Sequence, residues 1–176
     1  MYQGQAGGGA NGLTAGSARR RLAILLYSIA GGVYALDRAT KMLAEGFLQS
    51  GPPVEIIPGV FSLRFTTNPG GAFGLFGGLT WLFVTTSLVV TVVVVVASLN
   101  LPGRTSAVGL GLVLGGAVGN LTDRVIRGPG FSGEVVDFLD LQVWPVFNVA
   151  DSAIVVGAAL LLLSSFRLDR RRATRS

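Results

Sequence analysis

Residues 79–99 contain no charged side chain, and this apolar run sets the strongest limit on how the chain can fold. As an α-helix the run would rise about 32 Å, close to the roughly 30 Å hydrocarbon core of a bilayer. Its many valines do not argue for a strand, because a segment in lipid must satisfy its backbone hydrogen bonds internally. Half of the 176 residues are hydrophobic, more than a soluble domain of this length can bury. We therefore expect an integral membrane protein.

Three more segments are apolar enough to cross a bilayer. The four predicted spans cover residues 22–47, 79–99, 106–126 and 149–166. The loop 48–78 contains four prolines and a β-favouring run at 60–67, which predicts a small strand-bearing region outside the membrane. The expected fold is an all-α membrane protein, one domain at 19–168, with four transmembrane helices and a β-containing loop region.

The two ends of the chain lack this apolar character. Residues 1–18 are mainly Gly, Ala, Gln and Ser without periodicity and predict a disordered tail, whereas residues 169–176 form a basic tail. The first span also has a competing interpretation. Three arginines at 19–21 precede an apolar run that reaches Val-Tyr-Ala at 33–35, an order that is also found in cleaved secretory signals.

The net charge of +5 raises the question of nucleic-acid binding. Most basic residues instead flank the apolar segments: Arg19, Arg20, Arg21, Arg104, Arg167, Arg170, Arg171, Arg172 and Arg175. Because Lys and Arg gather on the cytoplasmic side of membrane proteins, both termini are expected in the cytoplasm and the loops 48–78 and 127–148 outside it. No basic-plus-aromatic surface pattern accompanies the charge, so we expect no nucleic-acid partner.

The chain contains neither Cys nor His. This composition excludes disulfides, thiol nucleophiles, the usual zinc sites and any relay between His and Ser or Cys. Chemistry in this chain must therefore use carboxylates, Lys, amides or hydroxyls. We expect neither a metal nor a cofactor.

Polar side chains gather at the predicted outer ends of all four spans, where each is costly to keep unless it has a partner or a function. They are Asp37, Lys41, Asn68, Asn120, Asp123, Arg124, Asn148 and Asp151. The spacing of Asn120, Asp123 and Arg124 puts them on one helical face, and the same holds for Asn148 and Asp151. The four outer ends are expected to form one polar site inside the bundle.

Several of these residues also have purely structural interpretations. Asp37 and Lys41, one turn apart, are equally compatible with an interfacial ion pair and with a functional pair. Asp123, next to an arginine, is most simply an orienting group. Asp151 is harder to explain as a helix cap, because Asn148 is the better placed N-cap residue.

Asp137 and Asp151 are the predicted catalytic pair. Two carboxylates that face each other in a partly dry site cannot both ionise easily, so one retains a proton. The ionised carboxylate can then activate water while the protonated one donates to a carbonyl oxygen, as in aspartic proteases. We choose Asp137 as the partner because it lies in the apolar run Val-Val-Asp-Phe, whereas Asp140 is expected to be a solvated loop charge.

Five short motifs occur in the order, and on the four spans, that are typical of one family. They are DRATK at 37–41, NPGGAFG at 68–74, GGAVGNLTDR at 115–124, VVDF at 135–138 and FNVADSAI at 147–154. By these motifs the chain resembles the lipoprotein signal peptidases, the type II signal peptidases of bacterial membranes. The resemblance extends over about residues 37–156 and is specific because five motifs coincide.

The resemblance implies an aspartyl endopeptidase of the bacterial cell membrane that removes the signal peptide of a diacylglyceryl-modified prolipoprotein. Cleavage would occur N-terminal to the lipid-modified cysteine, which the substrate supplies. The resemblance places the catalytic pair on Asp137 and Asp151, near the extracytoplasmic face. The family's supporting and substrate-clamping residues fall on Asp37, Lys41, Asn68, Asn120, Arg124 and Asn148. We expect membrane lipids around the chain and a monomeric state.

Two other classes of function remain open on the residues alone. A transporter could use Asp37, Asp123 and Asp151 as a proton or ion relay, but a relay needs polar stations in both halves of the membrane, and the inner halves are apolar. A non-enzymatic scaffold could use the glycines at every fourth position of 111–119 as a seam for close helix packing. Its carboxylate-rich outer face would then have no purpose.

Overall fold

The computed structural model describes residues 9–70 and 80–173. Its helices are α1 (Gly9–Leu48), α2 (Thr80–Ala97), α3 (Arg104–Ile126) and α4 (Val149–Ala173), with short 3-10 turns η2 (Ser98–Asn100) and η3 (Pro129–Phe131). The strands are β1 (Val54–Ile57), β2 (Phe61–Asn68) and β3 (Val135–Asp140). Within the described residues, four segments are long and apolar enough to cross a membrane: Gly16–Leu48, Thr80–Asn100, Arg104–Ile126 and Val149–Phe166. The predicted four-span fold with a small β-containing region is confirmed.

The helices extend further than the predicted spans. α1 begins at Gly9, so residues 9–18, predicted to be disordered, belong to the first helix. α4 continues to Ala173 and includes most of the predicted basic tail. A helix that has been nucleated gains one backbone hydrogen bond per added residue, so it can continue past its apolar segment. α1 is also unbroken through 33–35, which favours a membrane span over a cleaved signal.

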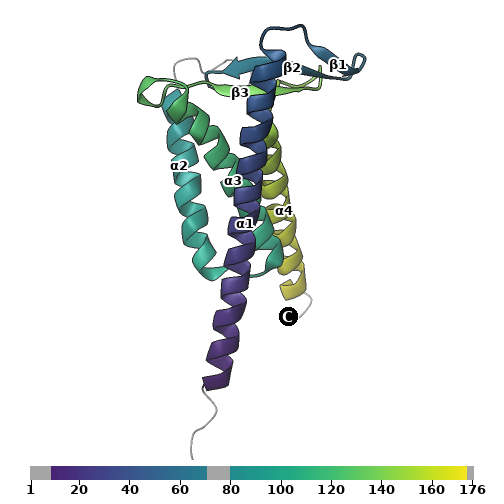
Figure 1. Ribbon diagram of the computed structural model, residues 1–176. Helices are drawn as coiled ribbons and strands as arrows, with labels where there is room; N and C mark the ends of the chain where they lie inside the picture. The colour runs from purple at the N-terminus through teal and green to yellow at the C-terminus, as the bar shows by residue number, and fades with distance from the viewer. Residues whose placement is uncertain (1–8, 71–79, 174–176) are drawn as a thin grey trace, which may run out of the picture.

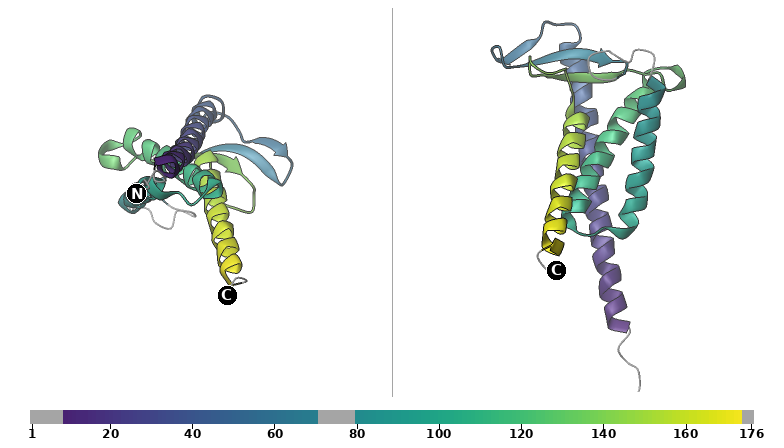
Figure 2. Two further views of the ribbon diagram at one scale, coloured as in Figure 1. Left: turned by 90° about the horizontal axis from the view of Figure 1, so that it is seen from below. Right: turned by 180° about the vertical axis from the view of Figure 1, so that it is seen from behind.

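α3 is the central helix and packs against α1, α2 and α4 (Figures 1 and 2). Gly111 and Gly115 face α1, and a Cβ added to Gly115 would lie 2.6 Å from the carbonyl oxygen of Ala30. Gly116 faces α4, where an added Cβ would collide with the carbonyl oxygen of Ala150. The predicted glycine seam is confirmed, because side chains at these positions would force the helix backbones apart.

Gly115→Val is expected to lower the free energy of unfolding by roughly 1–3 kcal/mol, because the new side chain must displace α1. The Cβ of Val33 lies only 2.7 Å from a Cβ added at this position. Gly32 offers a matched control, because nothing lies within 4 Å of a Cβ added there. Unfolding of the purified variants in mixed micelles measures the difference, and equal stability of Gly115→Val and Gly32→Val would contradict the close contact between α1 and α3.

The three strands form one antiparallel sheet in the order β1-β2-β3. The sheet lies across the end of the bundle that is remote from the C-terminus (Figure 1). β3 pairs with β2 so that Asp137 is opposite Thr66, and Asn68 is the last residue of β2. Val136 of β3 belongs to the same buried apolar cluster as Ala44 of α1. This packing fixes β3 against the first helix and places Asp137 over the helix ends.

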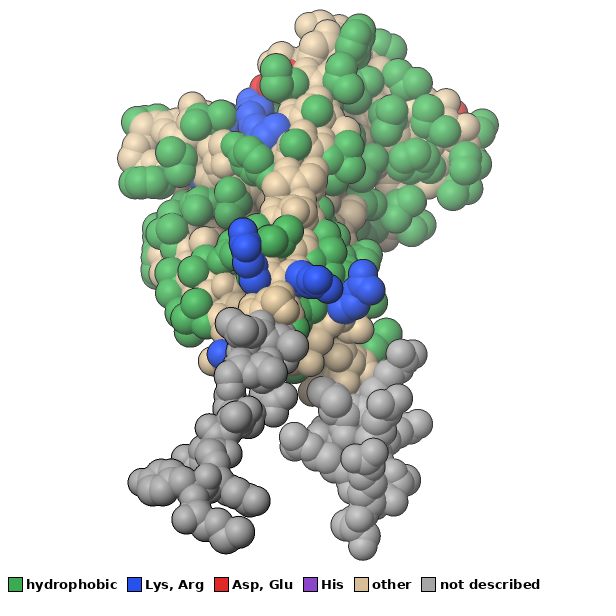
Figure 3. Space-filling view, turned by 60° about the horizontal axis from the view of Figure 1, so that its bottom comes forward, with side chains coloured by type: hydrophobic (Ala, Val, Ile, Leu, Met, Phe, Trp, Pro, Cys, Tyr) green, Lys and Arg blue, Asp and Glu red, His purple; other side chains and the backbone are tan. Residues whose placement is uncertain are grey.

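Basic side chains gather around the other end of the bundle (Figure 3). The arginines at 19–21 lie early in α1, and Arg104 is the first residue of α3. The bundle therefore has a basic end and a sheet end, and the residues of the predicted site belong to the sheet end.

Candidate active site

All nine predicted site residues belong to one network of hydrogen bonds and ion pairs. α1 supplies Asp37 and Lys41, β2 supplies Asn68, α3 supplies Asn120, Asp123 and Arg124, β3 supplies Asp137, and α4 supplies Asp151, with Asn148 directly before α4. Three of the four spans and two strands therefore meet at this point through side chains from distant parts of the sequence.

Asp137 is buried on β3, and both of its carboxylate oxygens are hydrogen-bonded. Asn148 Nδ2 donates to Oδ1 at 2.6 Å, and Asn68 Nδ2 donates to Oδ2 at 3.1 Å. The pKa of Asp137 is raised to about 7, mainly by burial and then by the negative charge of Asp151, against the lowering effect of the two amide hydrogen bonds. Asp137 therefore exchanges its proton near neutral pH.

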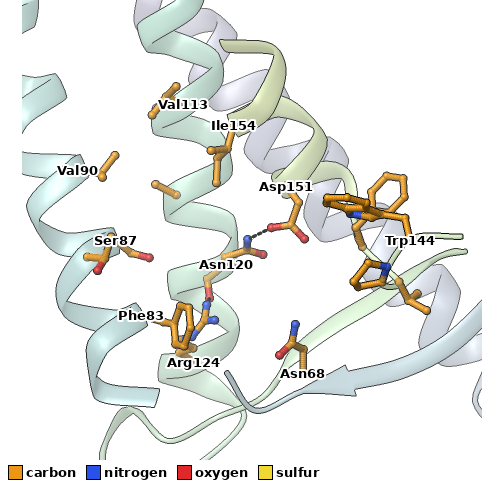
Figure 4. Close-up of a pocket in the computed structure, with 15 residues that line it drawn as sticks. Asn68, Phe83, Ser87, Val90, Val113, Asn120, Arg124, Trp144, Asp151 and Ile154 are labelled. Carbon is orange, nitrogen blue, oxygen red and sulfur yellow. Dashed lines mark hydrogen bonds between the residues drawn. The ribbon is translucent and has the colours of Figure 1, made fainter. Parts of the chain in front are cut away.

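Asp151 lies in the first turn of α4, and its carboxylate faces α3 (Figure 4). Asn120 Nδ2 donates to Asp151 Oδ1 at 2.7 Å. The backbone N–H of Asp151 donates to Asn148 Oδ1 at 2.9 Å, so Asn148 is the N-cap of α4, as predicted. Because Asn148 caps the helix, the carboxylate of Asp151 has no capping role and is directed at Asn120 and the adjoining cavity.

Two asparagine side chains connect the two carboxylates. Asn148 Nδ2, which donates to Asp137, also lies 3.2 Å from Asn120 Oδ1 and donates to it. Asn120 in turn donates to Asp151. Amides donate hydrogen bonds without neutralising charge, so this bridge holds the two carboxylates in one site and leaves their repulsion in place. Such a pair favours a state with one shared proton.

Lys41 and Asp37 are completely buried, which rules out a solvent-exposed interfacial ion pair. Lys41 Nζ lies 2.8 Å from Asp37 Oδ2, 2.8 Å from Asp123 Oδ2 and 2.9 Å from Asn120 Oδ1. We refer to Lys41, Asp37 and Asp123 as the lysine cluster. A single ammonium group thus joins two carboxylates and the amide that binds Asp151.

The acids of the lysine cluster also hold the backbone beside each predicted catalytic aspartate. Asp37 Oδ1 accepts the N–H of Ala150 at 3.0 Å, one residue before Asp151. Asp123 Oδ2 accepts the N–H of Val136 at 3.4 Å, one residue before Asp137. Among residues 9–70 and 80–173, no group of three or more His, Cys, Asp or Glu is placed to hold a metal ion. The acids are therefore engaged with a cation and with backbone amides.

A cavity of about 400 Å³ opens between α2, α3 and α4 beside Asp151 (Figure 4). Its apolar lining includes Val90, Val113, Ile154 and the segment 144–147, whereas its polar lining near Asp151 consists of Asn68, Asn120 and Arg124. Asp137 does not line the cavity, but Asn68 does and donates to Asp137. A mainly apolar cavity that ends at a carboxylate and two amides suits an apolar ligand with one polar group to be recognised.

Arg124 lines this cavity (Figure 4). Its guanidinium carbon lies 5.4 Å from the centroid of the Phe83 ring, and Nη1 donates to the carbonyl oxygen of Asn120 at 3.2 Å. Nε of Arg124 is buried and has no hydrogen-bond partner within the described part of the chain. Asp123 and Arg124, adjacent in sequence, therefore contact different parts of the site, and Arg124 borders the cavity.

Some features of this region differ from the prediction or were absent from it. Asp140, expected to be a solvated loop charge, is buried as the last residue of β3 and lies 3.2 Å from Arg64 Nε. α2 lines the cavity with Phe83 and Ser87, and the loop before α4 lines it with Trp144. No charge or motif distinguishes Phe83 or Ser87 in the sequence.

The family model described as signal peptidase (SPase) II matches residues 29–167, a range that includes all nine predicted site residues. The chain belongs to the signal peptidase II family. It is 50% identical over 146 residues to the lipoprotein signal peptidase of Rhodococcus jostii (strain RHA1), covering 82% of this chain and 73% of the relative. It is 43% identical over 151 residues to the lipoprotein signal peptidase of Desulfitobacterium hafniense (strain DSM 10664 / DCB-2), covering 84% of this chain and 97% of the relative.

A solved structure agrees with the family assignment. A bacterial membrane enzyme determined by the in meso method superimposes with a TM-score of 0.72 at 28% identity, covering 81% of this chain and 87% of that chain. This signal peptidase II is therefore a multi-pass bacterial membrane protein and an aspartic peptidase, and the resemblance inferred from the five motifs is confirmed.

Proposed function

We propose that this signal peptidase II removes the signal peptide of diacylglyceryl-modified prolipoproteins by means of water activated between Asp137 and Asp151. The observation that carries the proposal is the bridge of Asn148 and Asn120 between the two buried carboxylates, beside an apolar cavity. Relatives of 43–50% identity named lipoprotein signal peptidase support the substrate class. No metal or cofactor takes part in the proposed reaction.

The reaction starts with one proton shared by the pair. The ionised carboxylate accepts a proton from water as the water oxygen bonds to the scissile carbonyl carbon, while the protonated carboxyl donates to the carbonyl oxygen. The resulting gem-diol then collapses: one hydroxyl returns its proton to the ionised carboxylate as the C=O bond forms again, the C–N bond breaks, and the leaving nitrogen takes the proton of the other carboxyl, so the pair again holds one proton. The products are the free signal peptide and a new N-terminus at the lipid-modified cysteine.

The neighbouring polar residues have separate roles in this scheme. Asn68, Asn120 and Asn148 hold the two carboxylates through the hydrogen bonds described above. Arg124 lines the cavity, and its guanidinium group is placed to bind a carbonyl oxygen of an extended substrate. The lysine cluster holds Asn120 and the backbone next to each of the two aspartates, and it is not expected to contact the substrate.

The basic end of the bundle supports an orientation with both termini in the cytoplasm, because the arginines at 19–21 and Arg104 lie there (Figure 3). The sheet end, with Asp137 and Asp151, then faces the exterior. A reporter fused after Ser176 should be active only as a cytoplasmic reporter, and activity of an exterior-specific reporter at this position would reverse the orientation.

The cleavage rate is expected to fall as the pH is raised through about 7. The pKa of Asp137 is raised to about 7 by burial and by the charge of Asp151, so the proton that the reaction needs is lost from the pair above this value. The charged groups that act on Asp137 are Asp151 on α4, Arg124 on α3 and Lys41 on α1. Single-turnover cleavage in liposomes across the neutral range measures the profile, and a rate independent of pH there would contradict a shared proton.

Purified protein in lipid, incubated with a diacylglyceryl-modified prolipoprotein peptide and with the same peptide unmodified, tests the proposal. We expect cleavage of the modified peptide alone, immediately before the modified cysteine, as read by mass spectrometry. Equal cleavage of both peptides would remove the lipid from substrate recognition. Absence of cleavage of the modified peptide would contradict the proposed reaction.

A further inference from the structure

Arg127 contacts the charged part of the site from outside it and is not among the nine predicted residues. It follows the last residue of α3, and its guanidinium reaches two elements. Nε donates to Asp123 Oδ1 at 2.9 Å, whereas Nη1 and Nη2 both donate to the carboxylate of Glu45 on α1, Nη2 at 3.0 Å. One planar group thus joins the ends of α1 and α3 with three hydrogen bonds, a geometry that a lysine cannot reproduce.

Asp123 divides its two oxygens between different partners. Oδ1 accepts from Arg127 and Arg38, both at the periphery of the bundle. Oδ2 lies 2.8 Å from Lys41 Nζ and accepts the N–H of Val136 at 3.4 Å. The orientation of the carboxylate, and therefore the position of Oδ2 beneath β3, depends on the cations that hold Oδ1.

The backbone of Val136 connects Asp123 to Asp137, the next residue along β3 and the predicted catalytic carboxylate. Its N–H donates to Asp123, and its carbonyl oxygen accepts from Asn148 Nδ2 at 3.3 Å. Its side chain is fully buried. A backbone fixed on both sides of Val136 leaves Asp137 little freedom to move relative to Asn148, which binds its carboxylate.

We propose that Arg127 is a positioning residue for Asp137, acting through Asp123 and the backbone of Val136, with Glu45 as the residue that holds Arg127 in place. This inference rests on the proposed catalytic role of Asp137. Neither Arg127 nor Glu45 lines the cavity beside Asp151, so neither is expected to contact the substrate. The hydrogen bonds that Arg127 donates to Glu45 raise the pKa of its guanidinium, which keeps it charged despite partial burial.

Two observations separate this role from a general contribution to folding. Asp123 retains Arg38 and Lys41 when Arg127 is removed, so no buried carboxylate is left without a cation. The side chains of Arg127 and Glu45 are 20% and 32% exposed, so Glu45 remains in contact with water when Arg127 is replaced and is not left as a fully buried, unpaired charge. The main consequence of removing Arg127 is therefore a looser Asp123, not an unfolded protein.

Steady-state cleavage of a diacylglyceryl-modified peptide by Arg127→Gln, Glu45→Gln and the double variant tests the proposal. We expect Arg127→Gln to lower kcat by roughly 10- to 100-fold with KM unchanged, because a small displacement of a reacting group affects the chemical step. Glu45→Gln should have a smaller effect, and the double variant should match Arg127→Gln, since Glu45 acts only through Arg127. Arg64→Gln is the control, because Arg64 pairs with Asp140 on the same β3 strand and has no link to Asp123.

A raised KM with unchanged kcat in Arg127→Gln would place Arg127 in substrate binding and overturn the inference. Equal losses in Arg64→Gln, or additive losses in the double variant, would do the same. If Arg127→Gln does not fold, the kcat of Glu45→Gln tests the proposal instead, and an unchanged kcat in that variant rejects it. Full kcat in Arg127→Gln together with an inactive Asp137→Asn rejects this inference alone, whereas an active Asp137→Asn rejects the proposed function itself.

Discussion

Asp151→Asn is expected to lower kcat for prolipoprotein cleavage by about 1,000-fold or more, because an amide cannot accept or donate the proton that the reaction exchanges. The fold should be retained, since Asn has nearly the same shape and its Oδ1 can still accept the hydrogen bond from Asn120. Single-turnover cleavage in lipid measures the rate, and thermal unfolding in detergent measures the fold.

The same variant has an electrostatic consequence for Asp137. The negative charge of Asp151 is the second largest cause of the raised pKa of Asp137, after burial. Asp151→Asn should therefore shift the pKa of Asp137 downward, toward the ordinary carboxyl range. An active Asp151→Asn enzyme, or an unchanged pKa of Asp137 in that variant, would show that the two carboxylates do not act as a pair.

Lys41→Met is expected to destabilise the protein by about 3–5 kcal/mol, because it removes one partner from a buried ion pair and leaves the other charged. Within the described residues, the Asp37 carboxylate would retain only the N–H of Ala150, whereas Asp123 would keep Arg38 and Arg127. Activity should fall as well, since Lys41 also holds the Asn120 side chain that binds Asp151. Unfolding in mixed micelles measures the loss.

A double replacement separates the loss of an ion pair from the loss of a side chain. In Asp37→Leu/Lys41→Met, the unpaired carboxylate is removed together with its cation, so part of the lost stability should return while activity stays low. A single Lys41→Met variant as stable as the wild type would contradict the charged, fully buried state of this cluster. A double variant less stable than Lys41→Met would show that Asp37 stabilises the fold without Lys41.

The membrane spans and the convergence of their polar ends could be predicted because both depend on local patterns. Length and absence of charge set the spans, and helical spacing put Asn120, Asp123 and Arg124 on one face. The N-cap role of Asn148 followed from its position before an apolar helix and is confirmed. The glycine seam followed from the interval of four between Gly111 and Gly115 and is also confirmed.

Features that depend on pairing between distant segments could not be predicted in the same way. β3 is nearly all buried, so it lacks the alternation of polar and apolar residues that identifies a strand. Asp140 therefore looked like a loop charge, although pairing with β2 brings it against Arg64. Arg127 and Glu45 are 82 positions apart, and only the packing of α1 against α3 brings them together.

The sequence could not decide between the two interpretations of Asp37 and Lys41 for the same reason, because the answer depends on residues of a distant segment. Their spacing of four is compatible with an exposed ion pair and with a buried one, because it fixes only that they share a helical face. The structure decides for burial, since Lys41 also reaches Asp123 and Asn120 on the neighbouring helix. The polar residues of this network all lie at the sheet end. A transporter would also need proton- or ion-binding residues of this kind near the basic end, and the network supplies none there.

The most direct measurement of the central claim is single-turnover cleavage of a diacylglyceryl-modified peptide by Asp137→Asn compared with Asp140→Asn. Both aspartates are buried on β3, but only Asp137 is bound to the asparagine bridge that leads to Asp151, whereas Asp140 pairs with Arg64. The account predicts no detectable cleavage by Asp137→Asn and near wild-type cleavage by Asp140→Asn, with both proteins folded. Cleavage by Asp137→Asn at the wild-type rate would contradict it.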